Sequence, residues 1–409
     1  MIDWILIGIA IAALLGVIFE ELIHVNKAKT TLLLGTTAWI ILFIDANKGS
    51  GLEAVEKNLF INITEISTLW LFLVAAMTFV AYLNRKGLIE SMLNVIMPNQ
   101  ISLKKLLFMT AIFSFCFSSL ADNITATLVS IALLLSLGLP ANQTMRFAVL
   151  VVFSVNSGGV SLITGDVTTL MIFLQEKVTI TQLLWLILPS FSGVIVLASL
   201  LSFGLQGKVK IKKQHHHIRP VDYTIAVTFL STIILTLVGN VLFAIPPMLS
   251  FLAGMSIMFL VANDKDPILD YIRYIEFDTL LFFLGVLLIV GMLEHIHALH
   301  ALLDIYTMFP PVIANYIMGI LSSMIDNVPL TAALLKANIN MSFSEWMSLT
   351  YAVGVGGSLL VIGSAAGIVA MSKVQGLTFA RYGKYSLLLL ISYSSGYGLV
   401  LLMTQYLQS

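Results

Sequence analysis

The chain has one cysteine, Cys116, among its 409 residues. A single thiol excludes a disulfide framework and any metal cluster held by cysteines. Charge is also scarce, because only 10% of the residues are Asp, Glu, Lys or Arg, against about 25% in soluble globular chains. The 21 basic and 21 acidic residues leave no net charge, which argues against a nucleic-acid partner.

Apolar sequence is what the chain has in abundance. Hydrophobic residues make up 59% of it, and the mean hydropathy is +1.00. These values are typical of an all-α polytopic membrane protein. The N-terminus lacks the basic segment of a signal peptide, and its first apolar run ends at Glu20–Glu21 without a small-residue cleavage site. We therefore expect an uncleaved first helix in a multi-pass protein surrounded by lipid.

One short polar motif, called the Asp-Asn phrase below, occurs twice within apolar sequence. Ser118–Asn123 reads Ser-Ser-Leu-Ala-Asp-Asn, and Ser322–Asn327 reads Ser-Ser-Met-Ile-Asp-Asn. A charged side chain at membrane depth costs roughly 2.5–3.5 kcal/mol on insertion scales, so it persists mainly where it acts. The repetition indicates two related functional segments.

Two further patterns recur at similar offsets. The phrase repeats after 204 residues, from Asp122 to Asp326, and the glycine pattern Gly158–Gly165 returns after 198 residues as Gly356–Gly363. Glu65-x-x-Thr-Leu returns after 211 residues at Glu276. Offsets that agree this closely indicate one internal duplication. If each Asp-Asn segment is a re-entrant hairpin, each half crosses the membrane an odd number of times, and the two halves are inverted repeats.

The apolar runs predict the extent of each half. The first repeat, 1–207, should hold spans at 2–19, 30–46, 65–83 and 182–204, a re-entrant hairpin at 104–138 and a broken transmembrane helix at 143–175. A basic cytoplasmic linker at 208–220 follows. The second repeat, 221–409, should hold spans at 222–240, 246–262, 278–293 and 385–407, a hairpin at 310–337 and a broken span at 346–372. The segment Leu88–Met97 is too short to cross and predicts an interfacial helix.

The distribution of lysine and arginine predicts the orientation. With the loop at 20–30 placed in the cytoplasm, seventeen of the 21 basic residues fall on that side. Cytoplasmic loops carry such an excess. This supports ten crossings with both termini outside.

Interrupted helices in inverted repeats are typical of secondary transporters, whose site lies near the bilayer midplane. A broken helix exposes unpaired backbone groups, and carboxylates beside it supply hard oxygen ligands for a small cation. The candidate ion- and proton-binding residues are Asp122, Asn123, Thr125, Asn156, Asp166, Thr168, Thr169, Asp326, Asn327, Thr331, Ser358 and Ser364. The alternatives are that the carboxylates cap water-exposed loops and that each hydroxyl bonds its own helix.

The candidate site is acidic and asymmetric. Asp166 has Ser364 as its repeat counterpart, so a cation should lie nearer the first broken helix. None of the four interrupted segments contains Lys or Arg, which favours a cationic substrate. A buried carboxylate must be neutralised by a proton or a metal cation. If the two cannot bind together and the empty site cannot cross, they are exchanged, with no cofactor and no enzymatic reaction.

Four motifs carry a resemblance to a known family: Ala121–Thr127, Asn156–Met171, Asp326–Ala333 and Ile362–Gly367. On these the chain resembles NhaD-type sodium/proton antiporters of the ion transporter superfamily. The resemblance implies Na⁺ and Li⁺ as substrates, H⁺ as counter-ion, an elevator-like motion, homodimers and a prokaryotic inner membrane. Asp-Asn replaces the Ser-Asn-Thr of dicarboxylate carriers in the superfamily. One departure is Ser157, where alanine would be expected.

Three alternatives remain open. A sodium-coupled carrier of small anions or dicarboxylates could use the same fold, although the acidic segments argue against it. An intramembrane aspartyl protease would need Gly-x-Gly-Asp, and Ile163 stands in place of its first glycine. A channel would lack saturable exchange.

Other polar groups have simpler interpretations. Glu65 and Glu276 fall at expected helix starts, where carboxylates complement the helix dipole. The histidines at 215–217 and at 295–300 are expected to be solvated.

Overall fold

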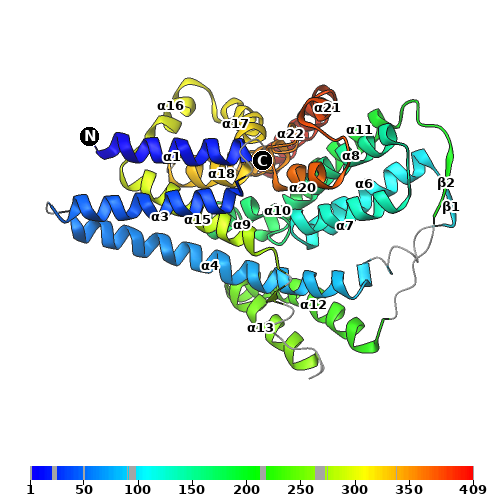
Figure 1. The fold of residues 1–409 in the computed structure, drawn as a ribbon, viewed down its shortest axis with the longest axis horizontal. Helices are drawn as coiled ribbons and strands as arrows, with labels where there is room; N and C mark the ends of the chain where they lie inside the picture. The colour runs from blue at the N-terminus through cyan, green and yellow to red at the C-terminus, as the bar shows by residue number, and fades with distance from the viewer. Residues whose placement is uncertain are drawn as a thin grey trace.

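The computed structural model describes residues 2–20, 25–48, 51–89, 91, 98–211, 218–262, 272–273, 275–337 and 339–408, and these form a nearly all-helical protein (Figure 1). Within them, strands β1 (Gln100–Ser102) and β2 (Lys208–Lys210) pair antiparallel, with Ile101 opposite Val209. Most of the interfacial helix expected at Leu88–Met97, and the histidines at 215–217, lie outside the described residues.

The helices before β2 are α1 (Ile2–Ile18), α3 (Lys27–Ala46), α4 (Leu52–Arg85), α6 (Leu103–Leu120), α7 (Asn123–Ser136), α8 (Ala141–Gly159), α9 (Val167–Leu174), α10 (Ile180–Trp185) and α11 (Ile187–Ser202). Those after it are α12 (Pro220–Phe243), α13 (Pro247–Val261), α15 (Phe277–His295), α16 (His300–Met308), α17 (Pro311–Ile325), α18 (Asn327–Lys336), α19 (Phe343–Gly356), α20 (Ala365–Lys373), α21 (Phe379–Gly383) and α22 (Ser386–Gln408).

Seven helices of the described chain are long and apolar enough to cross a membrane. They are α3, α4, α6, the consecutive pair α10–α11, α12, α15 and α22. Leu260 is 86% exposed and Leu33 65% exposed, as expected of side chains that face lipid. The chain is therefore an integral multi-pass membrane protein.

Two elements differ from the sequence expectation. Helix α4 begins at Leu52, before the apolar run expected at 65–83, because its charged first turns continue the same helix. The span expected at 182–204 is divided at Leu186 into α10 and α11. Pro189 lacks the N–H that would bond back to Trp185, so the hydrogen-bond ladder is interrupted there.

Four breaks between consecutive helices lie where the sequence indicated interrupted helices; the chain itself is continuous there. They separate α6 from α7, α8 from α9, α17 from α18 and α19 from α20. The helix after each break is capped by Asp122, Asp166, Asp326 or Ser364, whose side chain accepts a backbone N–H of the first turn. These residue types are preferred N-caps because their side chains satisfy N–H groups that lack helical partners. In Figure 1, α1 and α3 lie to the left and α6 and α8 to the right, and α18 packs against both α15 and α9.

The two halves repeat individual contacts. The Ser118 hydroxyl donates to the Val155 carbonyl at 2.7 Å, and Ser322 donates to Val353 at 2.7 Å. These pairs are related by the offsets 204 and 198 that the sequence motifs show. The helices α8 and α19, which precede the two broken segments, are buried along most of their length. The inversion of the halves across the membrane stays a prediction.

Candidate functional site

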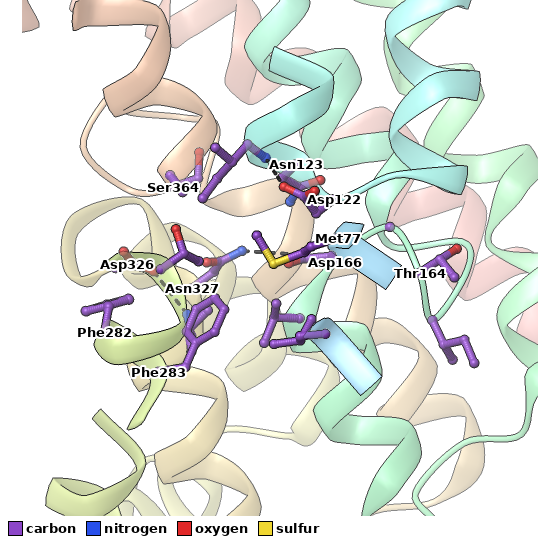
Figure 2. A pocket seen from close by; sticks show the side chains of 18 of the residues that line it. Met77, Asp122, Asn123, Thr164, Asp166, Phe282, Phe283, Asp326, Asn327 and Ser364 are labelled. Atoms are coloured by element: carbon purple, nitrogen blue, oxygen red, sulfur yellow. Dashed lines mark hydrogen bonds between the residues drawn. The ribbon is translucent and has the colours of Figure 1, made fainter. Parts of the chain in front are cut away.

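The four breaks meet at one pocket, shown in Figure 2. Six of the candidate residues line it: Asp122, Asn123, Asp166, Asp326, Asn327 and Ser364. The space that a water-sized particle can reach is about 60 Å³. Segments from both halves of the sequence thus form a single small site, which we call the site pocket.

Asp122 and Asp166 have parallel local geometry. Asp122 accepts the backbone N–H groups of Ile124 and Thr125 at 3.0 Å and the Thr125 hydroxyl at 2.7 Å. Asp166 accepts the Thr168 hydroxyl at 2.7 Å and the Thr168 backbone N–H at 3.4 Å. Thr125 and Thr168 therefore orient carboxylates. The positive end of each helix also stabilises the charge at its N-cap.

Asn327 connects the two halves at Asp166. Its amide nitrogen donates to Asp166 Oδ2 at 3.3 Å, a contact drawn in Figure 2. Asp166 is 6% exposed. Two of its three hydrogen bonds are long, at 3.3 and 3.4 Å, whereas those of Asp122 are 3.0 Å or shorter and Asp326 pairs with an ammonium. Of the three carboxylates it is therefore the one whose charge is least compensated by its neighbours.

Asp326 adopts a backbone conformation that only a few per cent of non-glycine residues show, with φ at +76°. Such positions cost about 1–3 kcal/mol and cluster at functional sites. The conformation lets its side chain accept the Val328 N–H at 3.2 Å while it pairs with Lys27 Nζ at 3.1 Å. The carboxylate is 3% exposed and the lysine side chain 14% exposed.

Lys27 is the site residue that sequence reasoning missed. The absence of Lys and Arg from the four interrupted segments did not reveal it, because Lys27 comes from α3, outside those segments. Its ammonium also lies 4.4 Å from the centre of the Phe282 ring, a cation–π contact. A cation in the first turn of a helix opposes the helix dipole. That unfavourable placement directly after the N-cap Asn26 is the signal that could have revealed it.

Neutral side chains around the pocket differ in how many of their polar atoms are hydrogen-bonded. The Asn123 amide is assigned with its nitrogen toward the Val155 and Gly165 carbonyls, because both neighbours are acceptors. Asn156 Nδ2 donates to Ser364 Oγ at 3.1 Å, whereas its buried Oδ1 has no partner among the described residues. Buried Thr169 Oγ1 is also unpartnered there. An unpaired buried oxygen suits a cation or water.

Six candidates do not line the pocket: Thr125, Asn156, Thr168, Thr169, Thr331 and Ser358. Two of them bond to carbonyls of their own segment. Thr331 donates to the Asn327 carbonyl at 2.7 Å, and Ser358 donates to the Val355 carbonyl at 2.6 Å. Both hydroxyls therefore bond their own helices, as the structural alternative predicted.

The pocket carries three carboxylates and one ammonium. Within the described residues, no three carboxylates, imidazoles or thiolates converge closely enough to hold a metal ion. A cation bound here would rely on one or two carboxylates and on neutral oxygens. Ligand pockets for drug-sized molecules measure about 300–1,000 Å³, so about 60 Å³ suits a small ion with few waters.

Glu65 is not at a helix start, and that expectation is wrong. It lies within α4, where its carboxylate pairs with Lys336 Nζ at 2.7 Å. Glu276 does precede α15, as its N-cap residue. The two glutamates therefore have different roles despite their similar sequence surroundings.

Interrupted helices that meet at a buried polar pocket in a multi-pass membrane protein define the class of secondary transporters. The family model described as "Citrate transporter" (CitMHS) matches residues 2–356, and the chain belongs to this family.

Curated relatives confirm the resemblance indicated by the motifs. The Na(+)/H(+) antiporter NhaD of Vibrio cholerae is 29% identical over 92% of this chain and 87% of its own length. Sodium/proton antiporter 1 of Arabidopsis thaliana is 29% identical over 90% of this chain and 68% of its own length. Among solved structures, the YdaH transporter of Alcanivorax borkumensis has a TM-score of 0.55 at 16% identity, covering 86% of this chain and 88% of the other. That structure was described as having an unusual topology and supports the fold alone.

Proposed function

We propose that the protein exchanges Na⁺, and Li⁺, for H⁺ across the membrane by competition at the buried carboxylates. The observation that carries this proposal is the meeting of Asp122, Asp166 and Asp326 in one pocket with one ammonium. When all four groups are ionised the site has an excess of negative charge, which a proton or a small cation can neutralise. Relatives named as sodium/proton antiporters support the choice of ions.

The three carboxylates have different partners, and this suggests different roles. Asp326 holds Lys27, and Asp122 accepts two backbone N–H groups and a hydroxyl. Asp166 relies on Thr168 and Asn327. We therefore assign the exchanging proton or Na⁺ to Asp166 first, with Asn156, Asn327 and Ser364 as neutral neighbours. Asp122 and Asp326 line the same pocket and contribute its remaining negative charge.

A citrate or dicarboxylate carrier is the second candidate, because the family description names citrate. A tricarboxylate would need unengaged cations and a larger cavity. The site pocket offers about 60 Å³, and its lysine already pairs with Asp326. These observations favour the small cation.

The proposal includes the arrangement in the membrane. It has two inverted repeats, ten crossings with both termini outside, an elevator-like motion and a homodimer in a prokaryotic inner membrane. The duplicated contacts of Ser118 and Ser322 support the internal repeat. The central site would be exposed in turn to the two sides of the membrane. It would change sides with either Na⁺ or H⁺ bound, but not while it is empty and charged.

Purified protein in proteoliposomes with an imposed pH gradient tests the function. Na⁺, Li⁺, K⁺ or citrate is added in turn, and luminal pH is followed for wild type, Asp166→Asn and Asp45→Asn, whose carboxylate is exposed on α3. Dissipation by Na⁺ or Li⁺ that disappears only in Asp166→Asn supports the proposal. If no cation changes luminal pH and sodium drives citrate uptake, the protein is the anion carrier instead.

A further inference from the structure

Three cavities follow one face of α4. The far cavity, about 600 Å³, is lined by Asn58, Glu294 and His295, among others. The middle cavity, about 170 Å³, is lined by Glu65, Leu69 and Met171. The site pocket comes next and is lined by Leu73 and Met77 of the same helix. The α4 residues 58, 61, 65, 69, 73 and 77 are spaced by three or four, so they share one side of the helix.

Lys336 lies at the junction of the far and middle cavities and lines both. Its ammonium pairs with Glu65 at 2.7 Å and with Glu294 at 3.1 Å. The lysine side chain is 13% exposed, whereas the two glutamates are 32% and 40% exposed. One side chain thus separates a polar, water-accessible cavity from the cavity nearer the site.

Both half-helices that begin in the site pocket end at this junction. Helix α9 starts after Asp166 and is followed by Gln175, whose amide donates to Glu65 at 3.1 Å. Helix α18 starts after Asp326 and ends at Lys336. At about 1.5 Å per residue, each junction residue lies roughly 14 Å along the helix from its carboxylate. A cation at the C-terminus of α18 is also favoured by the helix dipole.

Between the middle cavity and the site pocket the lining is apolar. Leu69, Leu73, Met171 and Phe283 are each less than 10% exposed, and they leave no charged group until the aspartates. In this conformation the path along α4 is therefore closed twice, first by the Lys336 ion pairs and then by packed side chains.

We propose that the three cavities mark an access route for the transported ion, and that the Lys336 pairs with Glu65 and Glu294 are its gate in the closed state. The route runs from the site pocket toward the end of the molecule where α4 begins and α15 ends. Lys27 lies at the other end of α15, beside Phe282, so the route is distinct from the Lys27 side of the pocket. This inference rests on the proposed function only in requiring transport, whatever the ion.

Thiol labelling in the membrane tests the gate. Cys116→Ser removes the single cysteine, and Met171→Cys then places one thiol in the middle cavity with little change in side-chain character. Vesicles of known orientation are treated with a cationic, membrane-impermeant methanethiosulfonate. We expect slow labelling of Met171→Cys when position 336 is Lys or Arg. With Lys336→Gln or Glu65→Gln we expect labelling up to about fivefold faster, the ratio that corresponds to about 1 kcal/mol, the upper value for exposed ion pairs.

The control is Lys177→Gln, because Lys177 also lies just beyond α9 but contacts the Trp346 ring, at 5.3 Å. The inference is overturned if Lys336→Gln leaves the labelling rate unchanged, if Lys177→Gln raises it equally, or if the thiol reacts rapidly while Lys336 is present. Glu294→Gln provides a second gate variant should Lys336→Gln fail to fold. Labelling does not depend on ion identity, so a failed sodium assay and a failed gate are distinguishable.

Discussion

Replacing Lys27 by methionine removes the ammonium that pairs with Asp326 in the site pocket, and with it a cation that a bound Na⁺ would have to displace from that carboxylate. At 3.1 Å and an effective dielectric of about 20, the gross attraction of the pair is about 5 kcal/mol. Desolvation offsets much of this, and breaking a buried pair by removing one partner costs about 3–5 kcal/mol. We therefore expect Lys27→Met to be less stable without Na⁺ and to bind Na⁺ more tightly, because Asp326 is left without a partner.

A change of about 1–3 kcal/mol in coupling corresponds to about 5- to 150-fold in affinity. The measurements are the KM for Na⁺ in proteoliposomes and the Na⁺-dependent rise in unfolding temperature in detergent. The matched control is Lys29→Met, because Lys29 lies two residues further along α3 and is exposed. An unchanged KM for Lys27→Met, with stability lost at every Na⁺ concentration, would show that Na⁺ does not use Asp326.

Three other outcomes follow from local geometry. A Cβ at Gly158 would overlap a backbone carbonyl of α6, so Gly158→Ala should lower stability by about 1–3 kcal/mol. Gly398, within α22, has no neighbour within 4 Å of such a Cβ, so Gly398→Ala should not lower the unfolding temperature. Asn156→Ala removes an unpartnered buried oxygen and should raise the KM for Na⁺ several-fold if that oxygen is a ligand, whereas an unchanged KM would remove it from the site. Burial, followed by the charge of Asp122, raises the pKa of Glu276 above its ordinary 4.5. Stability is therefore lost as pH rises from that ordinary value through the raised pKa, and Glu276→Gln should flatten the dependence of unfolding temperature on pH over that interval.

The positions of the interrupted helices could be predicted because local chemistry determines them. An aspartate at the end of an apolar run must cap a helix or remain unpaired, and Asp122, Asp166 and Asp326 all cap. The serine before each Asp-Asn phrase was visible only as a repeated letter. In the structure Ser118 and Ser322 bond carbonyls of neighbouring helices, which explains why the phrase extends beyond the charged residue.

Partners that are distant in the sequence could not be predicted in this way. Lys27 and Asp326 are 299 residues apart, and the sequence around either residue does not indicate that the other is its partner. The positive-inside count treated Lys27 as one loop charge among many, since that rule considers position relative to apolar runs and not contacts. Glu65 was misread for the same reason: its helix starts at Leu52, and its partner Lys336 belongs to the other half of the chain.

Helix α18 is held at both ends by ion pairs to the group that contains α3, α4 and α15. Its first end carries Asp326 paired with Lys27, and its last residue, Lys336, pairs with Glu65 and Glu294. A ten-residue helix moves as a unit, so a displacement that breaks one set of pairs strains the other. Na⁺ at Asp326 would free Lys27 and remove one of the two restraints. Lys27→Met should therefore speed labelling of Met171→Cys, although Lys27 lies at the opposite end of α18 from Lys336. An unchanged labelling rate in Lys27→Met would mean that α18 does not link the ion site to the gate.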